Sequence, residues 1–465
     1  MIKQTIKYPS SNTYFAGFLQ EIIDESAIKG SVEQKKNEIV LCLDDKDEEA
    51  LKKFSELTTK YLPHSFFIED IKTEVIEGEV TPLNFVSKPY DIGLCPRCLE
   101  AIKDPASSHY LDDSLVCTHY KNKPFYSNDT TIFSPHYSEG SSILVCDSSK
   151  VDELFILTDE EKKLLFSIEK PTIKVTIKSD EIKEFTGRDF IDIKAPYNTR
   201  STLAAINAKD ADMPYIFFHD CDDLKVVKVQ KNTVIVRAKR VAKELENLNE
   251  DKTLNRFLNL CKEADYEKAV AANLDTKGIS FLVKNDMDVK EVLKFSEFNL
   301  EKTLKKMQED EIRSKLLANF SKKYPEILER MQSEDLGFYE TLSLLLDVKE
   351  KGFNGLSEKA LLFRGNGGLK VDIFFDDEGV DYPALLGSMM SFKLAGADDY
   401  YIAYSFFEAV ADTAITTLTQ LKTKFAVPNS VMMGDMFSNS VLFSRILSKY
   451  SLSNPYFSKV TALSD

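Results

Sequence analysis

Cys95-Pro-Arg-Cys98 opens the stretch that organises the whole chain, and the stretch continues through Asp104-Pro105 to Cys117-Thr-His119-Tyr120. Two cysteines separated by two residues give a pair of thiolates the spacing that two corners of a zinc tetrahedron need, and Cys117 could supply a third. A standard zinc ribbon would place its last cysteine at position 120, where this chain has Tyr. Either His119 or His109 is then the fourth ligand, or the site is open, or the cysteines are reduced structural residues.

The composition limits the class of protein. The chain has 465 residues, of which 43% are hydrophobic and 11% aromatic, enough for about three or four folded domains. A formal net charge of −15 argues against a nucleic-acid surface, which needs a basic stripe. The sequence contains no apolar run long enough for a membrane span and no early signal-like segment. Seven cysteines without regular pairing are typical of the reducing cytoplasm, and only five histidines are present.

The cysteine stretch also carries a resemblance. Cys95 to Glu100, Asp104-Pro105, Tyr110 and Cys117 to His119 resemble the first zinc-ribbon half of the HypF family, carbamoyltransferases that help make the cyanide ligands of NiFe hydrogenases. The resemblance implies an α+β multidomain protein with the family's order of domains. We expect four parts: a ferredoxin-like, acylphosphatase-like domain at 1–78, a half-retained zinc ribbon at 90–140, a reduced YrdC-like α/β domain at 141–245, and a helical region with a reduced ASKHA-like (carbamoyltransferase-like) α/β domain at 250–465.

The first 78 residues predict a split βαβ pattern. We expect strands at 2–8, 28–34, 38–43 and 66–75, a helix capped by Ser11-Asn12, and a second helix at 48–60. By the resemblance, Ala16 stands where acylphosphatases have a phosphate-cradle Arg, and Gln34 stands where they have a water-positioning Asn. Loss of a charge that stabilises a phosphoryl transition state lowers the rate by orders of magnitude. This domain is therefore predicted to keep the fold without the catalysis.

The middle segment is similar to parts of a YrdC-like domain at residues 157–177 and 219–239. The family's early basic cluster and its Ser-Gly-Asn loop are absent between residues 141 and 245, so we do not expect ATP binding here. Cys221-Asp222-Asp223 is the most distinctive motif of this segment. Its carboxylates could bind magnesium or order basic partners, or they belong to a solvated turn, the interpretation that we favour.

Apolar spacings of three and four predict that residues 243–349 are mainly helical. No histidine follows His219, which excludes a histidine-ligated metal centre in the C-terminal half. The glycine-rich segment 364–370 precedes an apolar run at 371–375, so it is predicted to be a hairpin turn before a strand rather than a P-loop.

A long helix is predicted at 402–421, and the following segment resembles the nucleotide loop of the HypF family. Gly434, Phe437 and Asn439 match that loop, which makes Gly434 and Asn439 the candidate cofactor-binding residues. Asp435 replaces a glycine, and its carboxylate would repel phosphates.

Every module thus departs from the family at catalytic positions, and in this the chain resembles the HydE-type hydrogenase accessory proteins. The resemblance implies a non-catalytic, cytoplasmic accessory protein of hydrogenase maturation, with no catalytic residues and with zinc on Cys95, Cys98, Cys117 and His119. Its expected partner is a hydrogenase subunit or another maturation protein. Two alternatives stay open: an active carbamoyltransferase that uses carbamoyl phosphate and ATP, and a zinc-ribbon protein that binds nucleic acid, which the net charge opposes.

Overall fold

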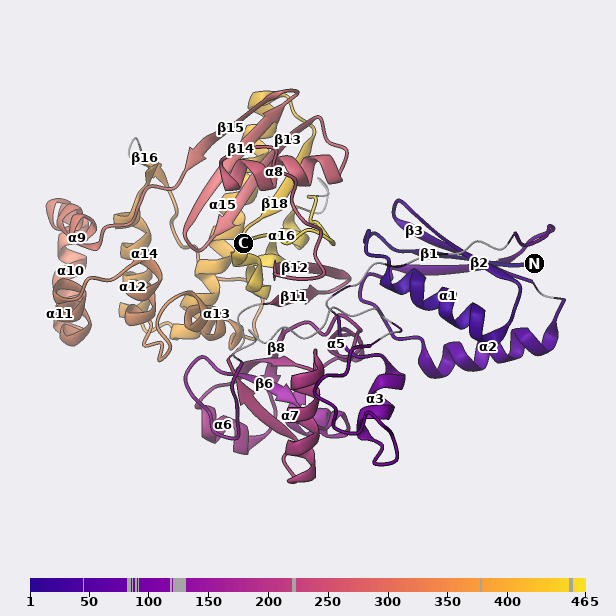
Figure 1. Cartoon of the computed structure of the whole chain (residues 1–465). Helices are drawn as coiled ribbons and strands as arrows, with labels where there is room; N and C mark the ends of the chain where they lie inside the picture. The colour runs from indigo at the N-terminus through magenta and orange to yellow at the C-terminus, as the bar shows by residue number, and fades with distance from the viewer. Residues whose placement is uncertain are drawn as a thin grey trace.

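The structure is a computed structural model, and it describes the chain except residues 45, 82–84, 86, 88–89, 91, 118, 120–130, 220–222, 377–378 and 451–454. Figure 1 shows an N-terminal sheet with two helices, a middle sheet, and a larger C-terminal part from which a group of helices protrudes. Secondary structure is mixed α and β throughout, as the α+β prediction requires.

The N-terminal part has the order strand, helix, two strands, helix, strand, with the bounds β1 Ile2–Lys7, α1 Tyr14–Ser26, β2 Gly30–Lys35, β3 Glu38–Leu43, α2 Glu48–Tyr61 and β4 Asp70–Val75. Its antiparallel sheet has the order β2-β3-β1-β4. The expected cap of the first helix is wrong, because α1 begins after Thr13. No side chain caps α1, and the Asn12 side-chain amide donates to the Val241 carbonyl at 2.5 Å.

The middle part is built on a six-stranded sheet with the order β5-β10-β6-β9-β8-β7. Helix α3, which precedes this sheet, spans Pro96–Lys103. The remaining bounds are β5 Phe133–Ser134, β6 Ser142–Val145, η1 Ser148–Lys150, α4 Val151–Leu154, β7 Phe155–Ile156, α5 Asp159–Leu165, β8 Ile173–Ile177, α6 Asp180–Thr186, β9 Phe190–Lys194, α7 Thr199–Asp210 and β10 Tyr215–Phe218. Buried side chains of the N-terminal sheet, α3 and this sheet form one continuous hydrophobic cluster.

The C-terminal part contains a four-stranded sheet with the order β15-β14-β13-β18, in which β18 runs parallel to β13. The bounds are α8 Lys252–Glu263, β13 Lys268–Asp275, β14 Gly278–Asn285, β15 Asp288–Lys294, α9 Leu300–Glu309, α10 Glu311–Lys323, α11 Pro325–Ser333, α12 Phe338–Leu345, α13 Phe353–Leu361, β16 Phe375–Asp376, β17 Gly379–Val380, α14 Tyr382–Leu394, α15 Asp399–Phe425, β18 Asn429–Met433, η2 Asp435–Ser438 and α16 Ser440–Lys449.

Two sequence predictions for this part are wrong. Residues 268–294 form three strands rather than helix, because β13 and β14 are buried on both faces and a continuous apolar run has no alternation to mark it as strand. Residues 364–370 are not a hairpin turn. The backbone N–H groups of Gly368 and Leu369 donate to Glu408 and Ser405 of α15, and the short hairpin lies later, between β16 and β17.

A hairpin, β11 Leu224–Val229 and β12 Asn232–Ala238, joins the middle and C-terminal parts. Thr172, next to β8, exchanges backbone hydrogen bonds with β11, and the last residues of the chain donate from Leu463 and Ser464 to β12. Residues far apart in the sequence therefore meet at this hairpin. No helix in the part of the chain that the structure describes has the length and hydropathy to cross a membrane.

Candidate functional site

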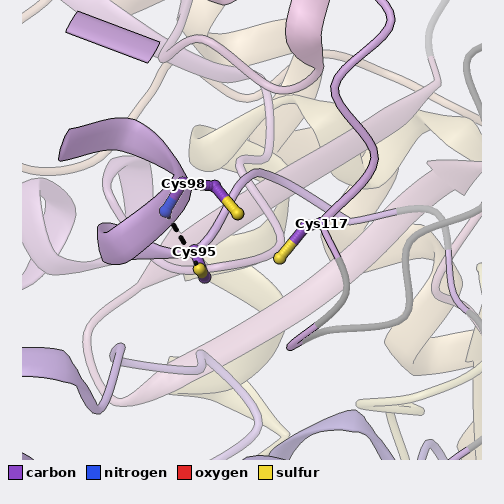
Figure 2. A group of neighbouring side chains, drawn as sticks. All are labelled: Cys95, Cys98 and Cys117. Atoms are coloured by element: carbon purple, nitrogen blue, oxygen red, sulfur yellow. Dashed lines mark hydrogen bonds between the residues drawn. The ribbon is translucent and has the colours of Figure 1, made fainter. Parts of the chain in front are cut away.

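The cysteine stretch forms a buried cluster at the start of α3. Cys95 is the residue that caps α3, with Pro96 in the first turn, and its Sγ accepts a hydrogen bond from the Cys98 backbone N–H at 3.3 Å. Cys117 comes from the loop that returns after α3. The three Sγ atoms lie within 4.8 Å of one another, all three residues are buried, and Figure 2 shows the sulfur atoms turned toward one another.

This donor set fits zinc. Three thiolates around Zn²⁺ lie about 2.3 Å from the ion, which places the sulfur atoms of a tetrahedron about 3.8 Å apart, so small side-chain rotations close the cluster around an ion. The adjacent Cys117 thiol, together with burial, raises the pKa of Cys98 to about 12. Without a cation the Cys98 thiol therefore keeps its proton, and a bound metal ion would displace that proton.

The structure places the two candidate histidines outside this group. His119 Nδ1 lies 3.1 Å from Glu21 Oε2 on α1, and His109 Nδ1 lies 3.2 Å from Asp112 Oδ2. Within the described chain the group that could hold a metal consists of the three cysteines. The ligand role of His119 stays a prediction. Sequence reasoning missed Glu21, because it lies 98 residues before His119 and belongs to no motif.

At the position predicted for a phosphate cradle, groups of the chain itself hold the loop that follows β1. Ala16 is fully buried. The Gln34 side-chain amide donates to the carbonyls of Ser10 and Asn12, at 3.0 Å each, and the Thr13 backbone N–H donates to the Tyr90 hydroxyl at 3.0 Å. The loop between β1 and α1 is thereby held by side chains of β2 and of the segment before α3.

The two candidate nucleotide-binding residues have structural roles. Gly434 has a φ of 112°, and a Cβ atom there would meet the Leu274 carbonyl, so only glycine fits. The Asn439 side chain caps α16 by accepting from the Leu442 N–H at 2.8 Å, and it donates to Ser357 Oγ at 2.8 Å. Their predicted cofactor role is not tested by these contacts.

Asp435 is buried in contact with three donors. Its carboxylate accepts from the backbone N–H and the hydroxyl of Thr276, at 2.7 Å each, and from Arg237 at 2.5 Å. Thr276 lies in the turn between β13 and β14, and Arg237 lies on β12. These donors border a polar cavity of about 460 Å³ between the middle and C-terminal sheets. The carboxylate of the chain thus occupies donors of the kind that bind phosphate.

Comparison with known proteins places this arrangement in a known fold. No family model matches the chain. Two solved structures match over its whole length: full-length HypF in a phosphate- and nucleotide-bound form, with 13% identity and a TM-score of 0.57, and HypF of T. kodakarensis, with 12% identity and a TM-score of 0.62. Each comparison covers 100% of this chain and 96% of the other. The chain has the HypF fold.

A curated relative points in the same direction as the HypF fold. Protein HydE of Wolinella succinogenes is 24% identical, over 86% of this chain and 88% of HydE. The match therefore spans most of both proteins rather than a single shared motif.

Within the HypF fold, the acidic motif of the middle part has a defined role at one residue. Asp223 accepts from Lys194 and from Arg240, the latter at 2.7 Å, so it orders basic partners of its own chain. Burial opposes its ionisation, but Arg240 and Lys194 hold the pKa of Asp223 well below its usual range. The favoured solvated-turn interpretation is wrong at this residue. Cys221 and Asp222 lie outside the described residues.

Proposed function

We propose that this protein is a HypF-like accessory protein of NiFe hydrogenase maturation that acts by binding and not by carbamoyl transfer. The HypF fold at full coverage and the similarity to HydE support the maturation role. The observation that carries the non-catalytic part of the proposal is Asp435, whose carboxylate uses the donors of Thr276 and Arg237.

The Asp435 contacts oppose nucleotide binding in two ways. A phosphate would have to displace three hydrogen bonds, two of them from the same residue, before it could reach those donors. It would also bring negative charge next to a buried carboxylate, and repulsion between close like charges is strong where water is largely excluded. Retained ATP chemistry at this loop would need a different set of donors.

The N-terminal part supports the same proposal. A phosphoryl-transfer site needs a cation and free N–H groups aimed at the phosphate. Ala16 provides no charge, and Gln34 and Tyr90 hold the neighbouring loop through its own backbone groups. Acylphosphatase-like catalysis would therefore need both a restored cation and a rearranged loop.

Zinc has a structural role in this proposal. Cys95, Cys98 and Cys117 would hold the ion, with His119 as the proposed fourth ligand, and the ion would stabilise a segment whose own apolar core is small. The proposed partner is a hydrogenase subunit or another maturation protein, in the cytoplasm. The formal charge of −15 disfavours nucleic acid as the ligand.

One purified sample tests the proposal against the alternative of an active carbamoyltransferase. Metal content is measured by mass spectrometry, and formation of AMP is measured from ATP with carbamoyl phosphate. We expect about one zinc per chain, lost in Cys95→Ser and retained in the control Cys42→Ser, because Cys42 lies on β3 outside the cluster. We expect no turnover. AMP formation above that of heat-treated protein would overturn the non-catalytic proposal.

Binding is tested separately. The tagged chain is mixed with a purified hydrogenase subunit that has not received its metal centre, and the complex is measured by size-exclusion chromatography. Formation of a complex supports the binding role. Failure to bind both the hydrogenase subunit and the other maturation proteins would refute it.

A further inference from the structure

A second cavity, of about 660 Å³, lies where the N-terminal, middle and C-terminal parts meet. Its walls come from β1 and the start of β4, from α5, from the hairpin β11–β12, and from the last residues of the chain; α5 is seen at this junction in Figure 1. The cavity is separate from the cysteine cluster and from Asp435, because it shares no lining residue with either.

We name this cavity the junction cavity. Most of the charged side chains that line it are basic. Five lysines and three carboxylates line the cavity, which gives it an excess of two positive charges, whereas the formal charge of the whole chain is −15. The lysines are Lys7, Lys163, Lys228, Lys231 and Lys459, and the carboxylates are Glu69, Asp70 and Glu160. An excess of this sign, enclosed by low-dielectric walls, attracts anions.

Ion pairs inside the junction cavity involve three of the five lysines, so the other two can contact a bound anion. Glu69 pairs with both Lys7, at 2.6 Å, and Lys459, and Glu160 pairs with Lys228 at 2.5 Å. Lys163 and Lys231 form no ion pair within 4.0 Å among the residues that the structure describes, although both lie near Glu160, whose pKa is lowered mainly by Lys228 and also by these two lysines. These two lysines come from different elements, α5 and the turn between β11 and β12, and both line the same cavity.

His64 adds a polar group to the same wall. Partial burial, together with the nearby Lys163 and Lys228, lowers the pKa of His64. Its imidazole is therefore neutral at pH 7 and can donate one hydrogen bond without adding charge.

The wall next to His64 is aromatic. The rings of Phe66 and Phe67 lie 4.4 Å apart, and both residues line the cavity together with Leu164. The cavity is much larger than one phosphate group needs, so a ligand that fills it would place an organic part against these rings.

We propose that the junction cavity binds a small organic phosphate monoester, with the phosphoryl group at Lys163, Lys231 and His64 and the organic part on Phe66. A phosphate monoester carries about two negative charges at pH 7, which matches the excess of positive charge in the cavity. The proposal is independent of the metal centre and of the loss of carbamoyl transfer.

Two probes test it, inorganic phosphate and phenyl phosphate, each titrated into the full-length protein and followed by the imidazole NMR signals. Five histidines give few signals, and His64→Gln identifies the one from the cavity. We expect the His64 signal to shift and its pKa to rise when the anion binds, while the His136 signal stays unchanged. Phenyl phosphate should bind more tightly than phosphate, and Phe66→Ala should remove that difference.

Charge variants provide the matched control. The double variant Lys163→Gln/Lys231→Gln should weaken binding by about tenfold, since each exposed charge contributes modestly. The neighbouring Lys162 pairs with Asp152 and does not line the cavity, so Lys162→Gln should leave the affinity unchanged. Equal weakening by Lys162→Gln, or no shift of the His64 signal with either probe, would overturn the proposal. Displacement of phenyl phosphate by a poly-glutamate peptide of much higher affinity would likewise overturn it in favour of an acidic protein segment.

Discussion

Replacement of Asp435 measures how strongly the contacts of its carboxylate stabilise the loop that begins at Gly434. Asp435 is 4% exposed, and Asp435→Ala removes the acceptor of three hydrogen bonds. A hydrogen bond to a charged group contributes about 1.5 to 3 kcal/mol. The Arg237 side chain is 34% exposed, so solvent screening reduces its share. We therefore expect Asp435→Ala to lower the free energy of unfolding by about 4 kcal/mol.

The variant Asp435→Asn keeps the size of the side chain but removes its negative charge, so it measures the contribution of the charge alone. The amide keeps one oxygen for the Thr276 N–H but presents a donor to Arg237, so we expect a smaller loss of about 2 kcal/mol. The assay is urea unfolding followed by circular dichroism, with stability read from the midpoint and slope. The control is Asp335→Ala, an exposed carboxylate that should change stability by less than about 0.5 kcal/mol.

The reasoning would be refuted if Asp435→Ala cost no more than Asp335→Ala. That result would mean that Thr276 and Arg237 find other partners without rearrangement, and the loop would then be open to an anion. ATP binding by Asp435→Ala, without a loss of stability, would be the most direct evidence for this outcome.

Three further predictions concern the metal, a buried acid and a contact between parts. Zinc should raise the melting temperature of the metal-free wild type but not of Cys117→Ser, as measured by calorimetry; an equal rise in both proteins would contradict the cluster. Burial raises the pKa of Glu169 above its value of 4.5 in the unfolded chain, so the wild type should lose stability as pH rises from 4.5 to the folded-state pKa. Glu169→Gln should not show this loss, and parallel urea midpoints across that window would disprove the assignment. Glu358 on α13 accepts hydrogen bonds from Lys174 and Arg188 of the middle part. Glu358→Gln should therefore lower the free energy of unfolding by about 2 to 3 kcal/mol and increase amide hydrogen exchange in β8. Unchanged exchange in β8 would show that this contact does not hold the two parts together.

Local patterns in the sequence predicted much of the N-terminal part and the long C-terminal helix. Short-range periodicity defines such elements, because a helix or a hairpin forms between residues that are close in the sequence. The same patterns failed at 268–294, where β13 and β14 are buried on both faces. An apolar run of that kind fits a buried strand and a buried helix equally well, and only its neighbours in space decide between them.

The candidate sites likewise divide into features that local sequence predicts and features that only the tertiary structure creates. The spacing of Cys95 and Cys98 was enough to propose a metal pair, because both residues lie in one turn of α3. The chemistry around the other candidates depends on distant residues: Glu21 beside His119 is 98 residues away, and Thr276 beside Asp435 is 159 residues away. No sequence pattern encodes such pairs, since they are brought together by the burial of apolar surface over the whole chain. The sequence by itself thus determined many of the local elements and the cysteine pair, whereas the tertiary structure decided which distant residues surround His119 and Asp435, because those contacts depend on the packing of the whole chain.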